Sequence, residues 1–199
     1  MKKILVYGSK EFGQVIKDLV IDCGHEFCGF IDDFSKGDEI IGDFKYVKFN
    51  YSSDIYHIII AVGYNNLEAR WLVYEKVCDS NFNTLTLIHP TAYVSKNSEL
   101  DTGSIVMAGV IIDTKVNASK LNVFWPGVVI NHDTKIGSNN FFSPNSTICG
   151  CCTIGSHCFI GAASVIVDHN VVLDHSFIKA NSTFFNNASK SPNNVNYKS

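Results

Sequence analysis

The chain has 199 residues, of which 46% are apolar and 18% charged, as is typical of one or two globular domains. The formal net charge of −3 gives no basic field, so we expect no nucleic-acid partner. No apolar run approaches the ~18 residues of a membrane span, which predicts no membrane insertion.

The chain contains seven cysteines and no visible signal peptide, which predicts reduced thiols and a cytoplasmic protein. The run CGCC at 149–152 suggests a metal site. Zinc sites normally need two ligand pairs at defined spacings, however, so we expect small residues in tight positions there and no metal.

Residues 1–85 alternate strands with helices, which predicts a small parallel sheet covered on both faces, a Rossmann-like α/β domain. The expected elements are strands over 3–7, 25–33 and 57–63, a glycine turn over 8–13, and helices over 14–22 and 65–80, the last capped by Asn65 or Asn66. A glycine turn between strand and helix suits a phosphate, and an acidic end of the second strand suits a ribose hydroxyl. The turn, GSKEFG, lacks the full dinucleotide fingerprint, so close strand–helix packing is an equal alternative.

Residues 86–185 repeat with a period of six. Stepping by six from Ile88 to Phe184 gives seventeen positions, all of them apolar, and the positions two residues earlier hold nothing larger than Asn or Val. Residues two apart on a strand share a face, so each short strand should turn one large and one small side chain inward. The pattern resembles the hexapeptide repeat of the left-handed parallel β-helix, in which residues eighteen apart stack. Residues 186–199 form a polar tail outside the repeat.

The whole chain resembles one family, the bacterial sugar O- and N-acyltransferases of the sialic-acid O-acetyltransferase and UDP-4-amino-sugar N-acetyltransferase type. The matching segments are GSKEFG, FIDD, AVGYNNLEAR, LIHPTAYVS and INHDTKIG followed by SPNSTICGCCTIGSHCFIGAASVI. The resemblance implies a nucleotide-sugar domain joined to a left-handed β-helix that forms trimers, with active sites between subunits. It implies nucleotide-sugar binding by Gly8, Ser9, Asp32, Asp33, Gly63 and Arg70.

His132 is the candidate base for acyl transfer. Transfer from a thioester needs a base for the attacking amine or hydroxyl and a donor for the oxyanion. Asp133 could orient the imidazole, and the stacking of residues eighteen apart brings Gly150 over His132, where its N–H could be the oxyanion donor. Spacing alone also fits an exposed turn histidine; the resemblance implies the catalytic roles.

His157 and His175 also stack, which raises the alternative of a metal-dependent hydratase on the same fold. His132 lies in a different phase of the hexapeptide, so we do not expect the three to share a metal.

Two positions depart from the family, which commonly has histidines where this chain has Phe12 and Phe141. The change at Phe141 suggests a different acceptor or acyl group, or weaker activity. A nucleotide-sugar-binding protein without transfer activity is therefore a further alternative.

These observations predict an acetyl-CoA-dependent acyltransferase that acts on the amino group of a UDP- or dTDP-linked sugar for surface glycan biosynthesis. O-acylation of sialic acid or a related sugar is the alternative acceptor chemistry. The acyl-CoA is expected along a trimer interface, near Phe141, Gly155, Gly161, Ala162 and Ala180.

Overall fold

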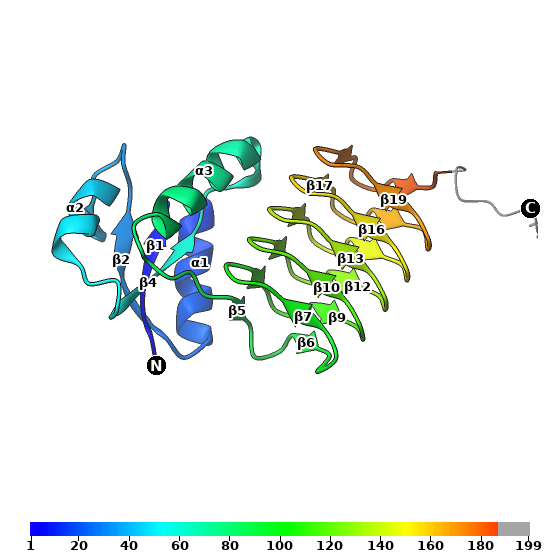
Figure 1. Cartoon of the computed structure of the whole chain (residues 1–199), viewed down its shortest axis with the longest axis horizontal. Coiled ribbons are helices and arrows are strands. Elements are labelled where there is room, and N and C mark those ends of the chain that lie inside the picture. Colours follow the sequence, from blue (N-terminus) through cyan, green and yellow to red (C-terminus); the bar gives the residue numbers. More distant parts are fainter. Residues whose placement is uncertain (187–199) are drawn as a thin grey trace, which may run out of the picture.

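The computed structural model describes residues 1–186 and contains an N-terminal α/β domain followed by a β-helix (Figure 1). The N-terminal domain lies beside the β-helix, whose coils follow one another from lower left to upper right in this view. Apart from Asn186, the predicted polar tail over 186–199 lies outside the described residues.

The N-terminal domain has a four-stranded parallel sheet in the order β3-β2-β1-β4. The strands are β1 Lys3–Tyr7, β2 Glu26–Ile31, β3 Ile40–Gly42 and β4 Tyr56–Ile60. The three predicted strands are confirmed, whereas β3 was not predicted because it has only three residues, two of them isoleucine, and no alternation to reveal it.

Helices cover both faces of this sheet, as the alternating pattern predicted. Helix α1 (Glu11–Asp22) packs with one face, and α2 (Phe44–Asn50) and α3 (Leu67–Cys78) pack with the other. A short 3-10 turn, η1 (Tyr64–Asn66), precedes α3. Asn66 is the cap, because its side chain accepts a hydrogen bond from the Ala69 N–H at 2.8 Å.

The β-helix has three flat parallel sheets, as the period of six predicted. The domain-facing sheet contains β5, β8, β11, β14, β17 and β20, the second sheet β6, β9, β12, β15, β18 and β21, and the third sheet β7, β10, β13, β16 and β19. Residues eighteen apart pair throughout, for example Val129 with Thr147. The strands are β5 Leu87–Ile88, β6 Tyr93–Val94, β7 Glu99–Leu100, β8 Ile105–Val106, β9 Ile111–Ile112, β10 Asn117–Ala118, β11 Val123–Phe124, β12 Val129–Ile130, β13 Lys135–Ile136, β14 Phe141–Phe142, β15 Thr147–Ile148, β16 Thr153–Ile154, β17 Phe159–Ile160, β18 Val165–Ile166, β19 Val171–Val172, β20 Phe177–Ile178 and β21 Thr183–Phe184.

The interior of the β-helix is filled by the large and small residues of the repeat. Its core includes Phe124, Ile130 and Phe142 from the large positions and Val128 and Cys152 from the small ones, each at most 1% exposed. The prediction that both sets point inward is therefore confirmed. Each aliphatic side chain buried in this way contributes about 1.5–3 kcal/mol to folding.

Three kinds of corner join the sheets, and each is named here by one residue. The His132 corner (131–134, 149–152 and 167–170) joins the second and third sheets, and the His157 corner (137–140, 155–158 and 173–176) joins the third and domain-facing sheets. The Trp125 corner (125–128, 143–146, 161–164 and 179–182) joins the domain-facing and second sheets.

The two domains share one hydrophobic core. Ile4, Ile16 and Phe30 of the N-terminal domain pack in the same cluster as Val123 and Phe141 from the domain-facing sheet. Because the domain-facing sheet is one side of a triangular prism, the opposite edge is the His132 corner. The N-terminal domain therefore lies on the side of the β-helix away from His132.

Candidate active site

A cavity of about 650 Å³ lies at the carboxyl ends of β1, β2 and β4. Ligands of open parallel sheets bind at this end of the strands, and this volume is in the range of small-molecule sites. It is bordered by the predicted residues Gly8, Ser9, Asp32, Asp33 and Gly63. The β-helix contributes Trp125.

The glycines of the GSKEFG turn are required by close packing. A Cβ on Gly8, which has φ +114°, would lie 2.6 Å from the Ala61 carbonyl oxygen, and one on Gly13 would lie 2.1 Å from the Gly8 carbonyl oxygen. Tight strand–helix packing therefore explains both glycines. The same turn borders the cavity, so packing and ligand binding are compatible here.

Asp32 holds the loop that follows β2. One carboxylate oxygen accepts hydrogen bonds from the N–H groups of Phe34 at 2.9 Å and Ser35 at 2.8 Å, and the other accepts the Ser9 hydroxyl. Burial raises the pKa of Asp32, but these hydrogen bonds outweigh it and keep the pKa below its ordinary value. The cavity thus has an ionised carboxylate on its wall at neutral pH.

Asp33 is committed to contacts within the protein. Its carboxylate accepts hydrogen bonds from the Phe44 N–H at 2.8 Å, from the Tyr7 hydroxyl, and from Lys76 Nζ at 2.9 Å. Burial opposes ionisation of Asp33, yet these donors lower its pKa. Burial, and after it the Asp33 carboxylate, raise the pKa of Tyr7. Asp33 borders the cavity and joins β1, α2 and α3 through these three hydrogen bonds.

The structure does not bring Arg70, which was predicted to bind the nucleotide, to the cavity. Arg70 is 0% exposed and does not border the cavity. Its Nη1 donates to the Leu121 carbonyl and to Asn139 Oδ1, both at 2.6 Å, so it ties α3 to the His157 corner. Burial lowers the pKa of its guanidinium. Arg70 is a structural link between the domains.

His132, Asp133 and Gly150 meet at the His132 corner, as expected from the eighteen-residue stacking. Asp133 has φ 57°, and this left-handed turn brings its carboxylate to 2.9 Å from His132 Nδ1. A Cβ on Gly150 would lie 2.7 Å from His132 Nε2, so the imidazole rests directly against the glycine. Among the described residues, no acceptor is found for the Gly150 N–H.

The residues predicted to contact the acyl-CoA divide between two corners. Gly161, Ala162 and Ala180 lie together at the Trp125 corner, where the Asn181 N–H donates to the Ala162 carbonyl at 2.8 Å. Gly155 lies at the His157 corner instead, packed against Asp174, so the structure does not bring it together with the other three.

The two phenylalanines that depart from the family pattern contact each other. Phe12 and Phe141 lie edge to face with ring centroids 5.8 Å apart, and Phe12 stacks on Trp125 at 5.7 Å. Phe141 is only 3% exposed and part of the interdomain core, which argues against its predicted contact with the acyl-CoA. The two phenylalanines therefore form a single apolar contact at the boundary between the domains.

Two aromatic residues at this boundary were not predicted. Tyr64 borders the cavity and packs against Phe141 and Phe159 at 5.1 and 4.8 Å, and Trp125 closes the cavity from the β-helix. Tyr64 lies in the segment AVGYNNLEAR, but nothing in that segment marks its ring as part of the site, and Trp125 does not occupy an inward position of the repeat. Only the contact between the domains brings them to the site.

A family model for the bacterial transferase hexapeptide (six repeats) matches residues 133–168, within the β-helix. The model of the PglD N-terminal domain matches residues 3–77. These two matches confirm the resemblance predicted from the sequence, and the chain has the two-domain architecture of the PglD-type acyltransferases.

Solved structures share this architecture over nearly the full chain. PerB from Caulobacter crescentus, solved with CoA and GDP-perosamine, has a TM-score of 0.84 at 23% identity, covering 93% of this chain and 89% of that one. The acetyltransferase domain of PglB from Neisseria gonorrhoeae has a TM-score of 0.76 at 24% identity, covering 91% and 98%. WeeI from Acinetobacter baumannii has a TM-score of 0.72 at 17% identity, covering 96% and 99%. Among the described residues, no helix is long and apolar enough to cross a membrane.

Proposed function

We propose that this protein transfers an acetyl group from acetyl-CoA to the amino group of a sugar linked to a nucleoside diphosphate. The observation that carries the proposal is the His132 corner, where a histidine, its carboxylate partner and a glycine N–H lie together. PerB was solved with CoA and GDP-perosamine, and the acetyltransferase domain of PglB was also solved with acetyl-CoA. The seven cysteines, all free in the structure, support a cytoplasmic location.

The chemistry assigned to His132 follows from its contacts. With the Nδ1 proton donated to Asp133, the Nε2 lone pair is free to take a proton from the attacking amine. The amine nitrogen bonds to the thioester carbon, and the Gly150 N–H stabilises the resulting oxyanion. The C–S bond then breaks, and the CoA thiolate takes the proton from the imidazolium. No acyl-enzyme is needed, and burial raises the pKa of the nearby Cys149 thiol, which disfavours it as a nucleophile.

The sugar nucleotide is assigned to the cavity of the N-terminal domain, which lies on the far side of the β-helix from His132. A second copy of the chain would close this distance. The outer face of the second sheet is partly apolar, with Tyr93 59% and Ile111 45% exposed and Val129 and Val165 half-buried. This sheet joins the His132 corner to the Trp125 corner. Packing it around a threefold axis would bring His132 of one subunit to the Trp125 corner of the next.

The transfer is tested by thiol release from acetyl-CoA across a panel of UDP-, dTDP- and GDP-linked amino sugars and sialic acids. We expect release with a nucleotide-linked amino sugar and a product that survives hydroxylamine, as an amide does. A hydroxylamine-labile product would assign O-acetylation instead. Binding of a nucleotide sugar without thiol release would identify a binding protein, the alternative motivated by Phe12 and Phe141.

Replacing Asp32 by asparagine should raise the KM for the nucleotide sugar by about 10- to 100-fold, the effect of losing a hydrogen bond to a charged group. The KM for acetyl-CoA should stay unchanged, because Asp32 lies at the cavity of the N-terminal domain. Steady-state kinetics with each substrate varied in turn measures both values. Asp54→Asn, an exposed loop substitution outside the cavity, is the matched control. An equal rise in both KM values would contradict the assignment.

A further inference from the structure

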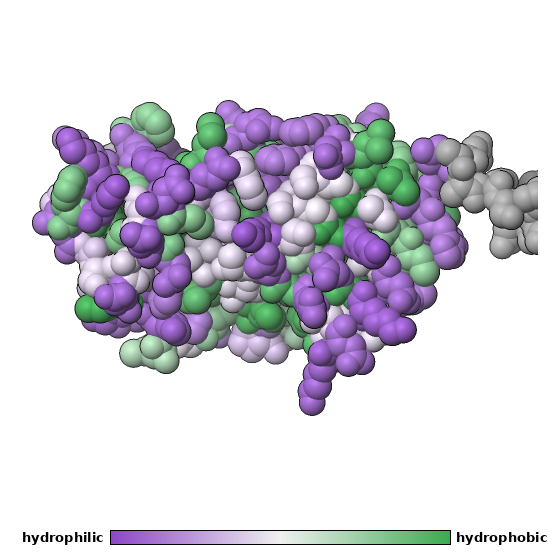
Figure 2. Space-filling view, in the orientation of Figure 1, coloured by the Kyte–Doolittle hydropathy of each residue, from purple (hydrophilic) through white to green (hydrophobic). Residues whose placement is uncertain are grey.

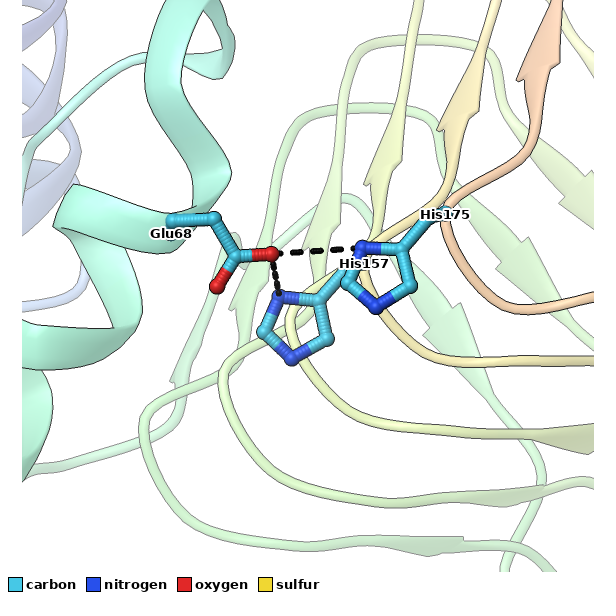
Figure 3. A group of neighbouring side chains, drawn as sticks. All are labelled: Glu68, His157 and His175. Carbon is cyan, nitrogen blue, oxygen red and sulfur yellow. Dashed lines mark ion pairs between the residues drawn. The ribbon is translucent and has the colours of Figure 1, made fainter.

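Glu68, His157 and His175 form a cluster between the N-terminal domain and the β-helix (Figure 3). Glu68 lies in the first turn of α3, and the two histidines lie on successive coils at the His157 corner. Glu68 Oε1 is 3.2 Å from His175 Nδ1 and 3.7 Å from His157 Nδ1. This cluster lies at a different corner from His132, so the proposed acyl transfer does not use it.

The backbone holds the two imidazoles in the same orientation. Both histidines have φ 59°, and their N–H groups each donate to the coil below, to Ser138 and Ser156, at 2.9 Å. The rings are stacked with centroids 4.9 Å apart and planes inclined by 15°. As Figure 3 shows, the nearer nitrogen of each ring faces the same carboxylate oxygen.

Hydrogen bonds that begin at Arg70 fix which atom of the Asn139 side chain faces His157. Arg70 donates to Asn139 Oδ1, so the Asn139 amide nitrogen must point the other way, where it donates to the Leu67 carbonyl at 2.7 Å. The same nitrogen is 3.0 Å from His157 Nδ1. Since an amide nitrogen is only a donor, His157 Nδ1 must present its lone pair.

Within the cluster, His157 and Glu68 therefore direct electron pairs at each other. The His157 Nδ1 lone pair and the Glu68 carboxylate are 3.7 Å apart, and no proton can lie between them while Asn139 donates to that nitrogen. His157 is the less exposed member, at 15%, against 63% for Glu68 and for His175. A cation placed among the three groups would convert this unfavourable arrangement into a favourable one.

We propose that Glu68, His157 and His175 bind a divalent transition metal of the zinc type. Their three ligand atoms lie within 4.8 Å of one another, and two imidazole nitrogens with one carboxylate oxygen suit zinc, with the fourth position left to water. On binding, His157 Nδ1 would exchange the Asn139 amide for the metal, while that amide keeps its bond to Leu67. The metal would join α3 to two coils of the β-helix.

The test is equilibrium dialysis of the full, metal-stripped chain against zinc, with bound metal measured by mass spectrometry. We expect one zinc per chain, and binding about 100-fold weaker or more in His175→Gln, because even the partners of metal ligands contribute 10- to 100-fold. His175 is well exposed, so this variant should fold. His169→Gln, whose histidine is 68% exposed at the His132 corner, is the matched control and should bind as the parent does.

X-ray absorption of the zinc-loaded chain identifies the ligands independently. We expect imidazole nitrogens and oxygen at about 2.0–2.1 Å and no sulfur at about 2.3 Å. Sulfur in the spectrum would assign the metal to His132, Asp133 and Cys151, whose ligand atoms also lie within 4.8 Å, and would overturn the proposal. So would the absence of stoichiometric zinc, or undiminished binding by His175→Gln.

Discussion

Replacing His132 by alanine lowers kcat for acetyl transfer by about 10²- to 10⁴-fold, the range that a general base contributes. The change leaves the fold intact, because the imidazole is 52% exposed and has no part in the core of the β-helix. Thiol release under saturating substrates measures the effect, and circular dichroism and size-exclusion chromatography check the fold and the assembly.

His169→Ala is the control for this prediction. His169 is also an exposed histidine at the His132 corner, with the same left-handed backbone conformation as Asp133. Its backbone N–H donates to the Gly150 carbonyl, and alanine keeps that bond. It should keep the parental kcat. If His132→Ala keeps a kcat within a few-fold of the parent, His132 is not the base and the transfer mechanism proposed above fails.

Replacing Arg70 by alanine destabilises the chain by about 3–5 kcal/mol, the magnitude of removing one partner of a buried polar network and leaving a cavity. Leu121 and Asn139 would lose their buried donor, and α3 would lose its tie to the β-helix. Urea unfolding followed by tryptophan fluorescence reports the loss, since Trp71 lies on α3 and Trp125 at the domain boundary.

The matched control is Lys76→Ala, which removes another cation of α3 whose side chain is 46% exposed. Its ion pair with Asp33 is only half-buried and should contribute about 1 kcal/mol or less. The structural role would be contradicted if Arg70→Ala kept the parental stability and raised the KM for the nucleotide sugar. That result would favour nucleotide binding by Arg70.

Most of the fold could be predicted because its signals are local and periodic. The apolar steps from Ile88 to Phe184 specify the inward face of each strand, and the strands and helices of the N-terminal domain follow from ordinary patterns. The β3–α2 segment was missed because Ile40–Gly42 is too short to show a pattern. Which of the three sheets the N-terminal domain covers could not be predicted, because no local pattern in the sequence indicates it.

In the candidate site, too, the features with a local sequence signal were predicted and those that depend on contacts between the domains were not. The meeting of His132 with Gly150 follows from counting eighteen residues, and the predicted residues of the cavity come from strand ends. The role of Arg70 depends on its contact with Asn139, which is 69 residues away in the sequence. No sequence pattern connects α3 with that position of the β-helix. Likewise, only the packing between the domains shows that Phe12 and Phe141 are one contact.

The exposed surface agrees with assembly into a larger unit. Figure 2 shows hydrophobic residues gathered on the last coils of the β-helix, where Leu173 is 73% and Phe177 70% exposed. Together with the apolar face of the second sheet, these side chains are exposed apolar surface of the kind that marks interaction sites.

Co-expression of His132→Ala chains with Asp32→Asn chains tests the central claim most directly, namely that one subunit holds the sugar nucleotide and its neighbour supplies His132. In randomly mixed trimers about a quarter of all sites combine an intact cavity with an intact histidine, because three-quarters of the trimers are mixed and each has one such site of three. We predict about a quarter of the parental activity at a nucleotide-sugar concentration where each variant alone is nearly inactive. Activity no higher than the mean of the two variants measured separately would contradict a site shared between subunits.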